Sequence, residues 1–232
     1  SWTPLAPVME AERLHAVEEA LHRVEARVRS AVDRLAAADI TTGCRNYDLD
    51  EPAARFAAKA ISLGLVSSVL KRCPADYYER ELEWRRDYLG AESTGHLCKS
   101  VVLENTRFVG GHAEDDSRYS RYILIICQYT RRLNPQNILR FVRDTLNSGR
   151  DIPAKNYNFR LAENYEDVTG FSHNAVTPVG MAREMPILLA DDILGLTPRH
   201  IWLGGGEVDL KWRVDVDELL QRLRPHVAPI YF

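Results

Sequence analysis

Apolar residues in the first forty positions recur at alternating steps of three and four. The apolar positions are Leu14, Val17, Leu21, Val24, Val28, Ala31 and Leu35. This spacing is typical of one long amphipathic helix whose apolar stripe can pair with another helix. We therefore predict an N-terminal helical extension over residues 1–40. The pattern allows it to pack on its own domain or on another chain, and we favour the second slightly.

Beyond residue 40, patterns typical of strands and of helices alternate without a regular rhythm. Asp50 and Pro52 predict a capped helix that ends near Ser62, and Asn134 begins another that ends near Leu146. Further helices are expected over 79–89, 159–167 and 215–224, and strands over 65–73, 99–104, 121–129, 187–190, 200–203 and 208–214. This irregular order predicts one α+β domain over residues 41–232, with a mixed, curved sheet and surrounding helices.

The composition is that of an ordinary globular protein. Of 232 residues, 45% are hydrophobic and 27% are charged, and the apolar runs are far too short to span a bilayer. We therefore expect a cytoplasmic protein. The cysteines (Cys44, Cys73, Cys98 and Cys127) are spread singly, with no CxxC pair. This spacing argues against a zinc site or a redox motif.

The charge is uneven along the chain. The formal net charge is -3, but the segment 131–160 has a local excess of basic residues. These residues are Arg131, Arg132, Arg140, Arg143, Arg150, Lys155 and Arg160, against Asp144 and Asp151. Such an excess is typical of a solvated helix face or of a strip that contacts phosphates. The charge alone does not choose between these two interpretations.

Several standard catalytic motifs are missing from the sequence. It has no GxGxxG after a strand, no GxxxxGK[ST], no HExxH and no GxSxG. A glycine triplet, Gly204 to Gly206, follows one predicted strand and leads into another rather than into a helix. The triplet therefore indicates a place where the backbone approaches something closely, or simply a tight turn or bulge.

Three segments read together resemble a known family. They are HLCKSVVLENT (96–106), GFSHNAVTPVGM (170–181) and IWLGGGEVDLKWRVDVDELL (201–220). Their order and spacing resemble the YbaK family, the prolyl-tRNA synthetase-associated editing domains, from about Asp50 to the C-terminus. The likeness is greatest to the stand-alone members.

The resemblance implies a trans-editing hydrolase that removes a wrong amino acid from tRNA, typically alanine or cysteine from tRNA(Pro). It also implies a mixed α/β domain around a barrel-like sheet, with neither a metal nor an organic cofactor. The implied partner is mischarged tRNA. The apolar stripe of the N-terminal helix adds, independently of the resemblance, an aminoacyl-tRNA synthetase, a multi-synthetase complex or a second copy of the chain as candidate partners. The family's single essential side chain is a lysine at the head of a strand, which corresponds to Lys99.

The resemblance also implies which other residues form the site. The family has a GxxxP loop that lines the amino-acid pocket; its proline corresponds to Pro178, between Thr177 and Gly180, and Asn174 takes the place of its glycine. Asparagine adopts the left-handed conformation more readily than other non-glycine residues. On the opposite wall we expect Gly205 and Gly206, with Asp209 as a lesser polar contact. The basic residues Arg131, Arg132, Arg140 and Arg143 become candidates for contacts with tRNA phosphates.

Two other functions remain compatible with the sequence. The domain can be a non-catalytic tRNA-binding or scaffolding subunit of a synthetase assembly, an interpretation that Asn174 favours and Lys99 opposes. It can also be a hydrolase of free amino-acid esters or small esters, which the basic strip makes less attractive. Without the other two segments, Lys99 would read as a solvated residue at a strand end. His96 and His173 flank the motifs, and we assign neither a catalytic role.

Overall fold

The computed structural model describes residues 15, 17–22, 24, 48–110 and 118–232. Its strands are β1 (Val69–Arg72), β2 (Cys98–Asn105), β3 (Tyr122–Gln128), β4 (Phe159–Leu161), β5 (Ile187–Ala190), β6 (His200–Gly204), β7 (Leu210–Asp215) and β8 (His226–Ala228). Its α-helices are α2 (Glu51–Ser62), α3 (Leu82–Leu89), α4 (Pro135–Arg140), α5 (Tyr165–Thr169) and α6 (Val216–Leu223). A π-helix, Phe141–Leu146, continues α4 directly, and short 3-10 turns cover Tyr77–Glu79, Thr94–His96, Ala154–Asn156 and Asp191–Gly195.

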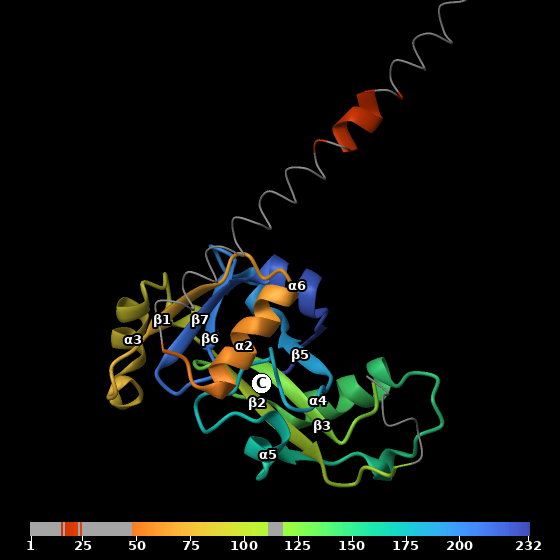
Figure 1. Ribbon diagram of the computed structural model, residues 1–232. Coiled ribbons are helices and arrows are strands. Elements are labelled where there is room, and N and C mark those ends of the chain that lie inside the picture. Colours follow the sequence, from red (N-terminus) through yellow and green to blue (C-terminus); the bar gives the residue numbers. More distant parts are fainter. Residues whose placement is uncertain (1–14, 16, 23, 25–47, 111–117) are drawn as a thin grey trace, which may run out of the picture.

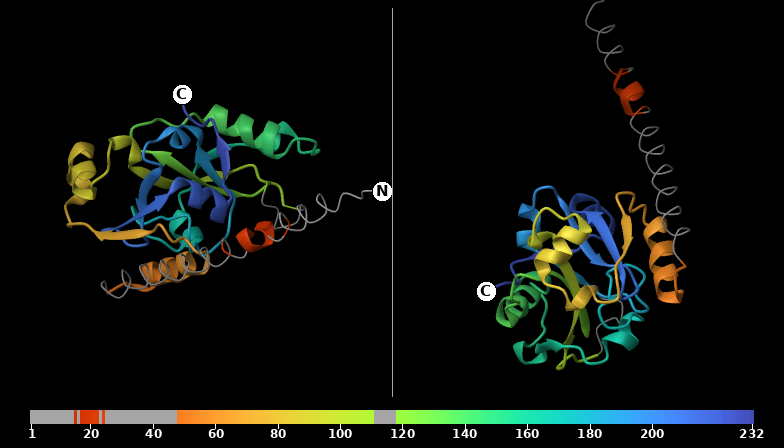
Figure 2. Two further views of the ribbon diagram at one scale, coloured as in Figure 1. Left: turned by 90° about the horizontal axis from the view of Figure 1, so that it is seen from above. Right: turned by 90° about the vertical axis from the view of Figure 1, so that its left-hand side faces the viewer.

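Within these residues the strands form two sheets (Figure 1). The larger sheet has the order β4-β2-β3-β5-β8, and the smaller has the order β1-β7-β6. β3 pairs antiparallel with β2 and parallel with β5. The fold is therefore the mixed α+β arrangement that the alternating patterns predict. Helices α2, α3 and α4 are distributed around the two sheets (Figure 2).

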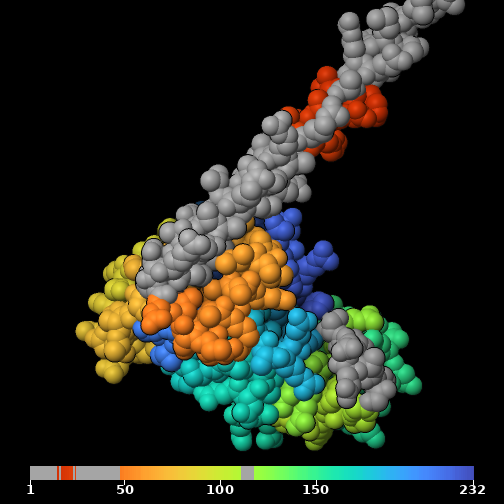
Figure 3. Space-filling model, in the orientation of Figure 1, coloured from red at the N-terminus to blue at the C-terminus, as the bar shows by residue number. Residues whose placement is uncertain are grey.

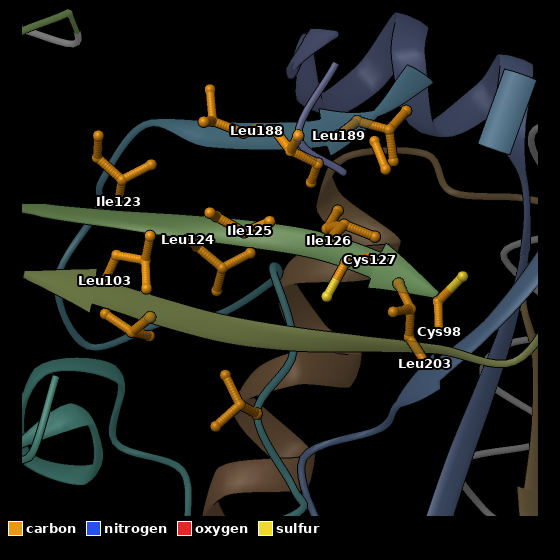
Figure 4. Packing of buried hydrophobic residues seen from close by; sticks show 14 of the residues in the cluster. Cys98, Leu103, Ile123, Leu124, Ile125, Ile126, Cys127, Leu188, Leu189 and Leu203 are labelled. Atoms are coloured by element: carbon orange, nitrogen blue, oxygen red, sulfur yellow. The ribbon is translucent and has the colours of Figure 1, made fainter. Parts of the chain in front are cut away.

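The larger sheet is centred on β3 because every residue of this strand is apolar or buried among apolar neighbours. All seven residues of YILIICQ are buried. Figure 4 shows the aliphatic side chains of β3 between those of β2 and β5, with Leu103 and Leu188 among them. A short apolar run without alternation is typical of a strand covered on both faces. This core fixes the positions at which β2 begins and β3 ends.

Helix α2 forms as its sequence predicts. The Asp50 side chain accepts a hydrogen bond from the Ala53 amide, and Pro52 occupies the first turn, where its missing amide hydrogen costs nothing. Ala53, Phe56, Ala57 and Ala60 form the buried face. The small alanines allow neighbouring backbone to approach the helix closely. Figure 3 shows the outer side of α2 on the surface, beside the segment that includes α5.

The smaller sheet has a second apolar cluster on its outer face. Trp202 of β6 packs with three apolar residues. Leu97 directly precedes β2, Tyr77 begins the 3-10 turn 77–79, and Leu89 is the last residue of α3. An isolated parallel bridge between Leu97 and Trp202 joins the two sheets. The sheets therefore meet along one narrow line, and the segment 77–89 covers the outer face next to it.

Three expectations differ from the structure or fall outside it. The sheet is not closed into a barrel: within the described residues β2 pairs with β3 and β4, and the chain just before β2 is joined to β6 by the isolated Leu97–Trp202 bridge rather than by a ladder. The predicted helix 159–167 is wrong at its start: residues 159–161 pair with Leu103 to Asn105 as β4, and the helix begins at Tyr165. Residues 17–22 are helical and exposed, but most of the predicted extension 1–40 lies outside the described residues.

Within the described residues, no helix is both long enough and apolar enough to cross a membrane.

Candidate active site

Lys99 lies where the two central strands meet at one edge of the core. It is the second residue of β2, three residues after the 3-10 turn 94–96, and it pairs with Cys127 near the end of β3. Its side chain is half-buried, and its Nζ lies 5.3 Å from the centre of the Tyr129 ring. This separation allows a cation–π interaction. The sheet therefore holds this ammonium group beside an aromatic ring at the start of a strand.

A cavity of about 400 Å³ opens beside Lys99. Its lining comprises Tyr77, Tyr78, Leu89, Leu97, Cys98, Lys99, Ser100, Val101, Val102, Tyr129, Leu161, Ala162, Tyr165, His173, Asn174, Val176, Trp202, Leu203, Gly204 and Lys211. The volume is within the range of pockets that bind small ligands. The lining contains two lysines and no aspartate or glutamate. The cavity is therefore cationic as well as largely apolar.

Lys211 is the second cation of this cavity, and the sequence did not single it out. It lies on β7 and is only 4% exposed. Its Nζ donates to the Tyr78 hydroxyl at 2.6 Å and to the Val208 carbonyl at 2.8 Å. Burial disfavours the charged ammonium and lowers its pKa to about 8. Lys211 is thus held in place by neutral oxygens rather than by a carboxylate.

Tyr78 connects Lys211 to the loop that the family resemblance marks as a pocket wall. Its hydroxyl donates to the Asn174 carbonyl at 2.8 Å. Burial raises the pKa of Tyr78 well above its usual range, so the hydroxyl remains a donor at neutral pH. The hydrogen bonds therefore run from the Lys211 ammonium through Tyr78 to the backbone of the loop.

Asn174 lines the cavity with a left-handed backbone, φ +66°. This is the conformation that a glycine at the same position would adopt readily, and asparagine adopts it at modest cost. The neighbouring residues His173 and Val176 also line the cavity. The loop therefore keeps a shape suited to glycine although the glycine itself is replaced.

The rest of this loop lies behind the cavity rather than in its lining. Thr177 and Pro178 are buried, and Gly180 packs on α2. A β-carbon on Gly180 would lie 3.0 Å from the Phe56 Cα, and its φ is +74°. The Arg55 Nε donates to the Gly180 carbonyl at 2.7 Å. These residues fix the loop on the helix; direct contact with a substrate remains a prediction for them.

The glycine triplet makes close backbone contacts, and most of them are with the protein itself. Gly204 lines the cavity, and a β-carbon there would lie 2.8 Å from the Val176 carbonyl oxygen. Gly205 donates to the Leu210 carbonyl at 2.9 Å, and Gly206 has φ +96° and lies against α2 at Ala53. Gly205 and Gly206 lie outside the lining, so Gly204 is the member of the triplet that borders the cavity.

Asp209 also lies outside the lining. Its carboxylate accepts from Arg72 at 2.8 Å, and its side chain is 41% exposed. Arg72 also forms an ion pair with Glu207. The structure therefore shows Asp209 in a surface ion-pair network between β1 and the turn before β7.

The four arginines of the predicted tRNA strip all lie outside the cavity lining: two just after β3, one at the end of α4 and one in the π-helix that continues it. Arg131 and Arg132 follow β3 by a few residues, and thus lie in sequence just beyond the cavity residue Tyr129. Arg131 forms an ion pair with Asp192 at 2.9 Å. Arg140 is exposed at the end of α4, and Arg143 forms an ion pair with the adjacent Asp144. Contacts of these arginines with tRNA remain a prediction.

One group of side chains has the composition of a metal site. Glu92, His96 and His200 place three potential ligand atoms within 4.8 Å of one another. However, the His96 Nδ1 is 2.8 Å from the Ser93 hydroxyl, and its Nε2 is 3.0 Å from the Pro198 carbonyl oxygen. Since a carbonyl oxygen only accepts, Nε2 carries the proton and lacks the lone pair that a metal requires. His96 is therefore a hydrogen-bonded structural residue in this arrangement.

Comparison with known proteins adds information about the fold. No family model matches the sequence, and no curated protein matches it. Among solved structures, a protein proposed as a trans-editing enzyme for prolyl tRNA synthetase superposes with a TM-score of 0.61 at 22% identity, covering 80% of this chain and 99% of that one. The chain has a YbaK-like fold.

Two further structures agree with this result. A structure from work on grafting epitope backbones onto scaffold proteins gives a TM-score of 0.59 at 22% identity, and covers 79% of this chain and 99% of its own. A hypothetical protein gives 0.57 at 16% identity, with 77% and 99% covered. The family resemblance is thus confirmed at the level of the fold, over the YbaK-like part of the chain.

Sequence reasoning identified Lys99 and Asn174 but missed Lys211, Tyr78 and Trp202. Lys211 alternates with Leu210 and Trp212 along β7, a pattern that normally places a lysine in solvent. The segment that contains Tyr78 covers this face and turns it into a cavity wall. Only contacts between residues far apart in the sequence could have shown this.

Proposed function

We propose that this protein is an aminoacyl-tRNA deacylase that hydrolyses the ester of tRNA mischarged with a small amino acid. The preferred substrates are Ala-tRNA(Pro) or Cys-tRNA(Pro). The observation that carries the proposal is Lys99, at the head of β2, beside a cationic cavity free of carboxylates in a YbaK-like fold. The trans-editing role proposed for one structural neighbour supports the same class of reaction.

The chemistry requires little of the protein. The ester between an amino acid and ribose is already activated, so water can attack its carbonyl without a Ser-His-Asp triad. The C–O bond to the ribose breaks, and the ribose hydroxyl leaves with a proton that originates from the water. The Lys99 ammonium, fixed by β2, stabilises the negative charge that develops on the carbonyl oxygen. The cavity excludes bulk water and larger amino acids.

The conformation of Asn174 favours this proposal over a non-catalytic subunit. The replacement of glycine at this position was the feature that pointed to lost activity. Asn174 nevertheless keeps the left-handed backbone, and its carbonyl is fixed by Tyr78. The loop therefore retains the shape that a pocket wall needs.

The decisive experiment is deacylation by the Lys99→Ala variant. We expect the purified protein to release alanine from Ala-tRNA(Pro), and Lys99→Ala to lower the rate roughly 100-fold or more, the typical effect of removing a group that stabilises an oxyanion. The measurement uses tRNA(Pro) charged with Ala, Cys, Ser and Pro, so that specificity is read in the same assay.

Lys59→Met is the matched control because Lys59 is exposed on α2 and does not line the cavity. This control should retain the full rate, and circular dichroism should show that both variants are folded. Equal rates for the wild-type protein and Lys99→Ala would refute the role of Lys99. A folded wild-type protein that releases none of the four amino acids, but still binds tRNA, would favour the non-catalytic subunit.

A further inference from the structure

The ammonium group of Lys211 is buried beside two neutral oxygens and two tyrosine rings: its Nζ lies 4.4 Å from the centre of the Tyr78 ring and 5.2 Å from that of Tyr77. A lysine ammonium has three N–H donors. The two hydrogen bonds of Lys211 go to the Tyr78 hydroxyl and the Val208 carbonyl, which are both neutral oxygens. Buried charges in proteins are normally paired with an opposite charge. The lining of the cavity offers Lys211 no carboxylate.

Two further polar groups in the lining have no partner within the described residues. The Trp202 Nε1 and the Ser100 Oγ are both buried and make no hydrogen bond there. An indole N–H can only donate, and a buried donor without an acceptor is costly. Trp202 is 4% exposed, so solvent does not satisfy this group. Among the described residues, the lining therefore contains an indole donor without an acceptor and a serine hydroxyl that can donate or accept.

The strand register relates Trp202 to the strands of both lysines. Lys211 is paired with Gly204 in the ladder, so Trp202 is its diagonal neighbour on the same face of the smaller sheet. Trp202 also forms the bridge with Leu97, two residues before Lys99. Lys99 and Lys211 therefore belong to strands that flank β6 on opposite sides, with β2 next to β6 at this bridge and β7 on its other edge.

We propose that the Lys211 end of the cavity binds an anionic oxygen group, a carboxylate or a phosphate, of the ligand whose reacting ester lies at Lys99. Lys211 supplies the charge, and the Trp202 indole donates a hydrogen bond to the same group. This inference rests on the proposed deacylase function, because the ligand is taken to be an aminoacyl-tRNA end. Alanyl and cysteinyl esters have no side-chain carboxylate, so for these substrates the anionic group is a phosphate at the 3′ end of the tRNA. A side-chain carboxylate as the anionic group would instead mean that an acidic amino acid is the one removed.

The test uses two matched pairs of small, non-hydrolysable probes. The first pair is adenosine 5′-monophosphate and adenosine, which differ in the phosphate. The second pair is 3′-aspartylamido-3′-deoxyadenosine and its alanyl counterpart, which differ in the side-chain carboxylate. Binding to the full-length protein at pH 7 is measured by titration calorimetry. In at least one pair we expect the anionic member to bind about tenfold more tightly, the effect of one charge-assisted hydrogen bond.

Three variants assign that preference to Lys211. Lys211→Met and Lys211→Gln should each reduce the preference to about twofold or less, and the glutamine can still donate to Tyr78 if the methionine variant fails to fold. Lys71→Met is the control: Lys71 is the ladder partner of Lys211 on β1 but does not line the cavity, and its loss should leave the preference intact.

The pair that shows the preference identifies the source of the anionic group. Equal binding within both pairs by the wild-type protein, or a preference that survives in the folded Lys211→Gln variant, would overturn the inference. Neither result depends on turnover. The deacylase proposal fails independently, if the charged tRNA panel is not hydrolysed.

Discussion

At the scale of single residues, the two lysines of the cavity are in different environments. Lys99 is half-buried at the head of β2, beside the Tyr129 ring. Lys211 is almost fully buried, and burial lowers its pKa from 10.5 to about 8. A folded protein that carries such a group binds fewer protons between these two pH values than the unfolded chain does. The free energy of unfolding must therefore depend on pH in this window.

The first prediction concerns the Lys211→Met variant. The lowered pKa makes a contribution to stability that is present above pH 10.5 and is lost as the pH falls through about 8. As the pH rises from 8 to 10, the free energy of unfolding of the wild-type protein should therefore increase relative to that of Lys211→Met, by up to about 3 kcal/mol for a shift of this size. Urea denaturation of both proteins at several pH values measures the difference.

Because tyrosines and cysteines also titrate in this range, only the difference between the two proteins is informative. Those groups are shared, so their effects cancel in the comparison. Lys71→Met, on the neighbouring strand, should follow the wild-type pH dependence. Parallel stability curves for the wild type and Lys211→Met would show that Lys211 has an ordinary pKa.

At the scale of elements, the loop 170–181 is held to α2 by its backbone. Arg55 of α2 donates to the carbonyl of Gly180 and, at 2.9 Å, to that of Gly170. Gly180 lies so close to the helix that a β-carbon would approach backbone atoms of Phe56 and Arg55 at 3.0 to 3.1 Å. The helix therefore determines where Asn174 stands at the cavity wall, although α2 itself contributes no lining residue.

The second prediction compares Gly180→Ala with Gly90→Ala. Both glycines have nearly the same backbone, φ +74° and +71°, but a β-carbon on Gly90 would meet nothing within 4 Å. Both variants incur the cost of a left-handed alanine, about 1 kcal/mol. Gly180→Ala should lose about 1 to 3 kcal/mol more, because its methyl group collides with the backbone of α2.

Thermal or chemical unfolding of the two variants gives this comparison directly. The extra loss should be accompanied by weaker substrate binding, since the loop carries Asn174. If the two substitutions destabilise the protein equally, the loop does not pack on α2 as closely as described.

At the scale of the whole molecule, Lys99 and the first two arginines of the basic strip lie toward the same end of the larger sheet. Lys99 pairs with Cys127, and Arg131 and Arg132 follow that end of β3. The opposite end of the same ladder is marked by Glu104, which pairs with Tyr122, next to Arg121. A tRNA whose 3′ end lies at Lys99 would therefore pass Arg131 and Arg132 rather than Arg121.

The third prediction follows from this arrangement. Arg132→Ala should weaken tRNA binding and reduce the slope of log affinity against log salt concentration by roughly one, the effect of losing one phosphate contact. Arg121→Ala is the control, because its ion pair with Glu104 lies at the far end of β2 and β3. Filter binding over a range of salt concentrations provides both slopes.

A change of the salt slope in Arg121→Ala but not in Arg132→Ala would place the tRNA on the other side of the molecule. Equal slopes in all three proteins would show that neither arginine contacts a phosphate. In either case Arg132 would be a solvated residue and not a phosphate contact.

Much of the fold could be predicted from local patterns. Asp50 and Pro52 predict the start of α2, and the buried run YILIICQ predicts β3, because capping and burial on both faces leave clear local signals. The segment 159–161 was misassigned as helix. Its strand conformation comes from pairing with β2, and the exposed side chain of Leu161 gives no alternation that reveals it. The barrel-like sheet that the family resemblance implies was also wrong, since the strands form two separate sheets. Whether a sheet closes depends on pairings between strands that are distant in the sequence.

Local patterns were sufficient to place Lys99 at the head of a strand, because a short apolar run depends on neighbours within a few residues. The resemblance to the family's GxxxP loop marked Asn174 as a position suited to a left-handed backbone. That Lys211 belongs to the same cavity could be seen only in the folded chain, since Tyr78 comes from a segment 133 residues away. Burial of a charge depends on what covers it, and the periodicity of a single strand does not record what covers it.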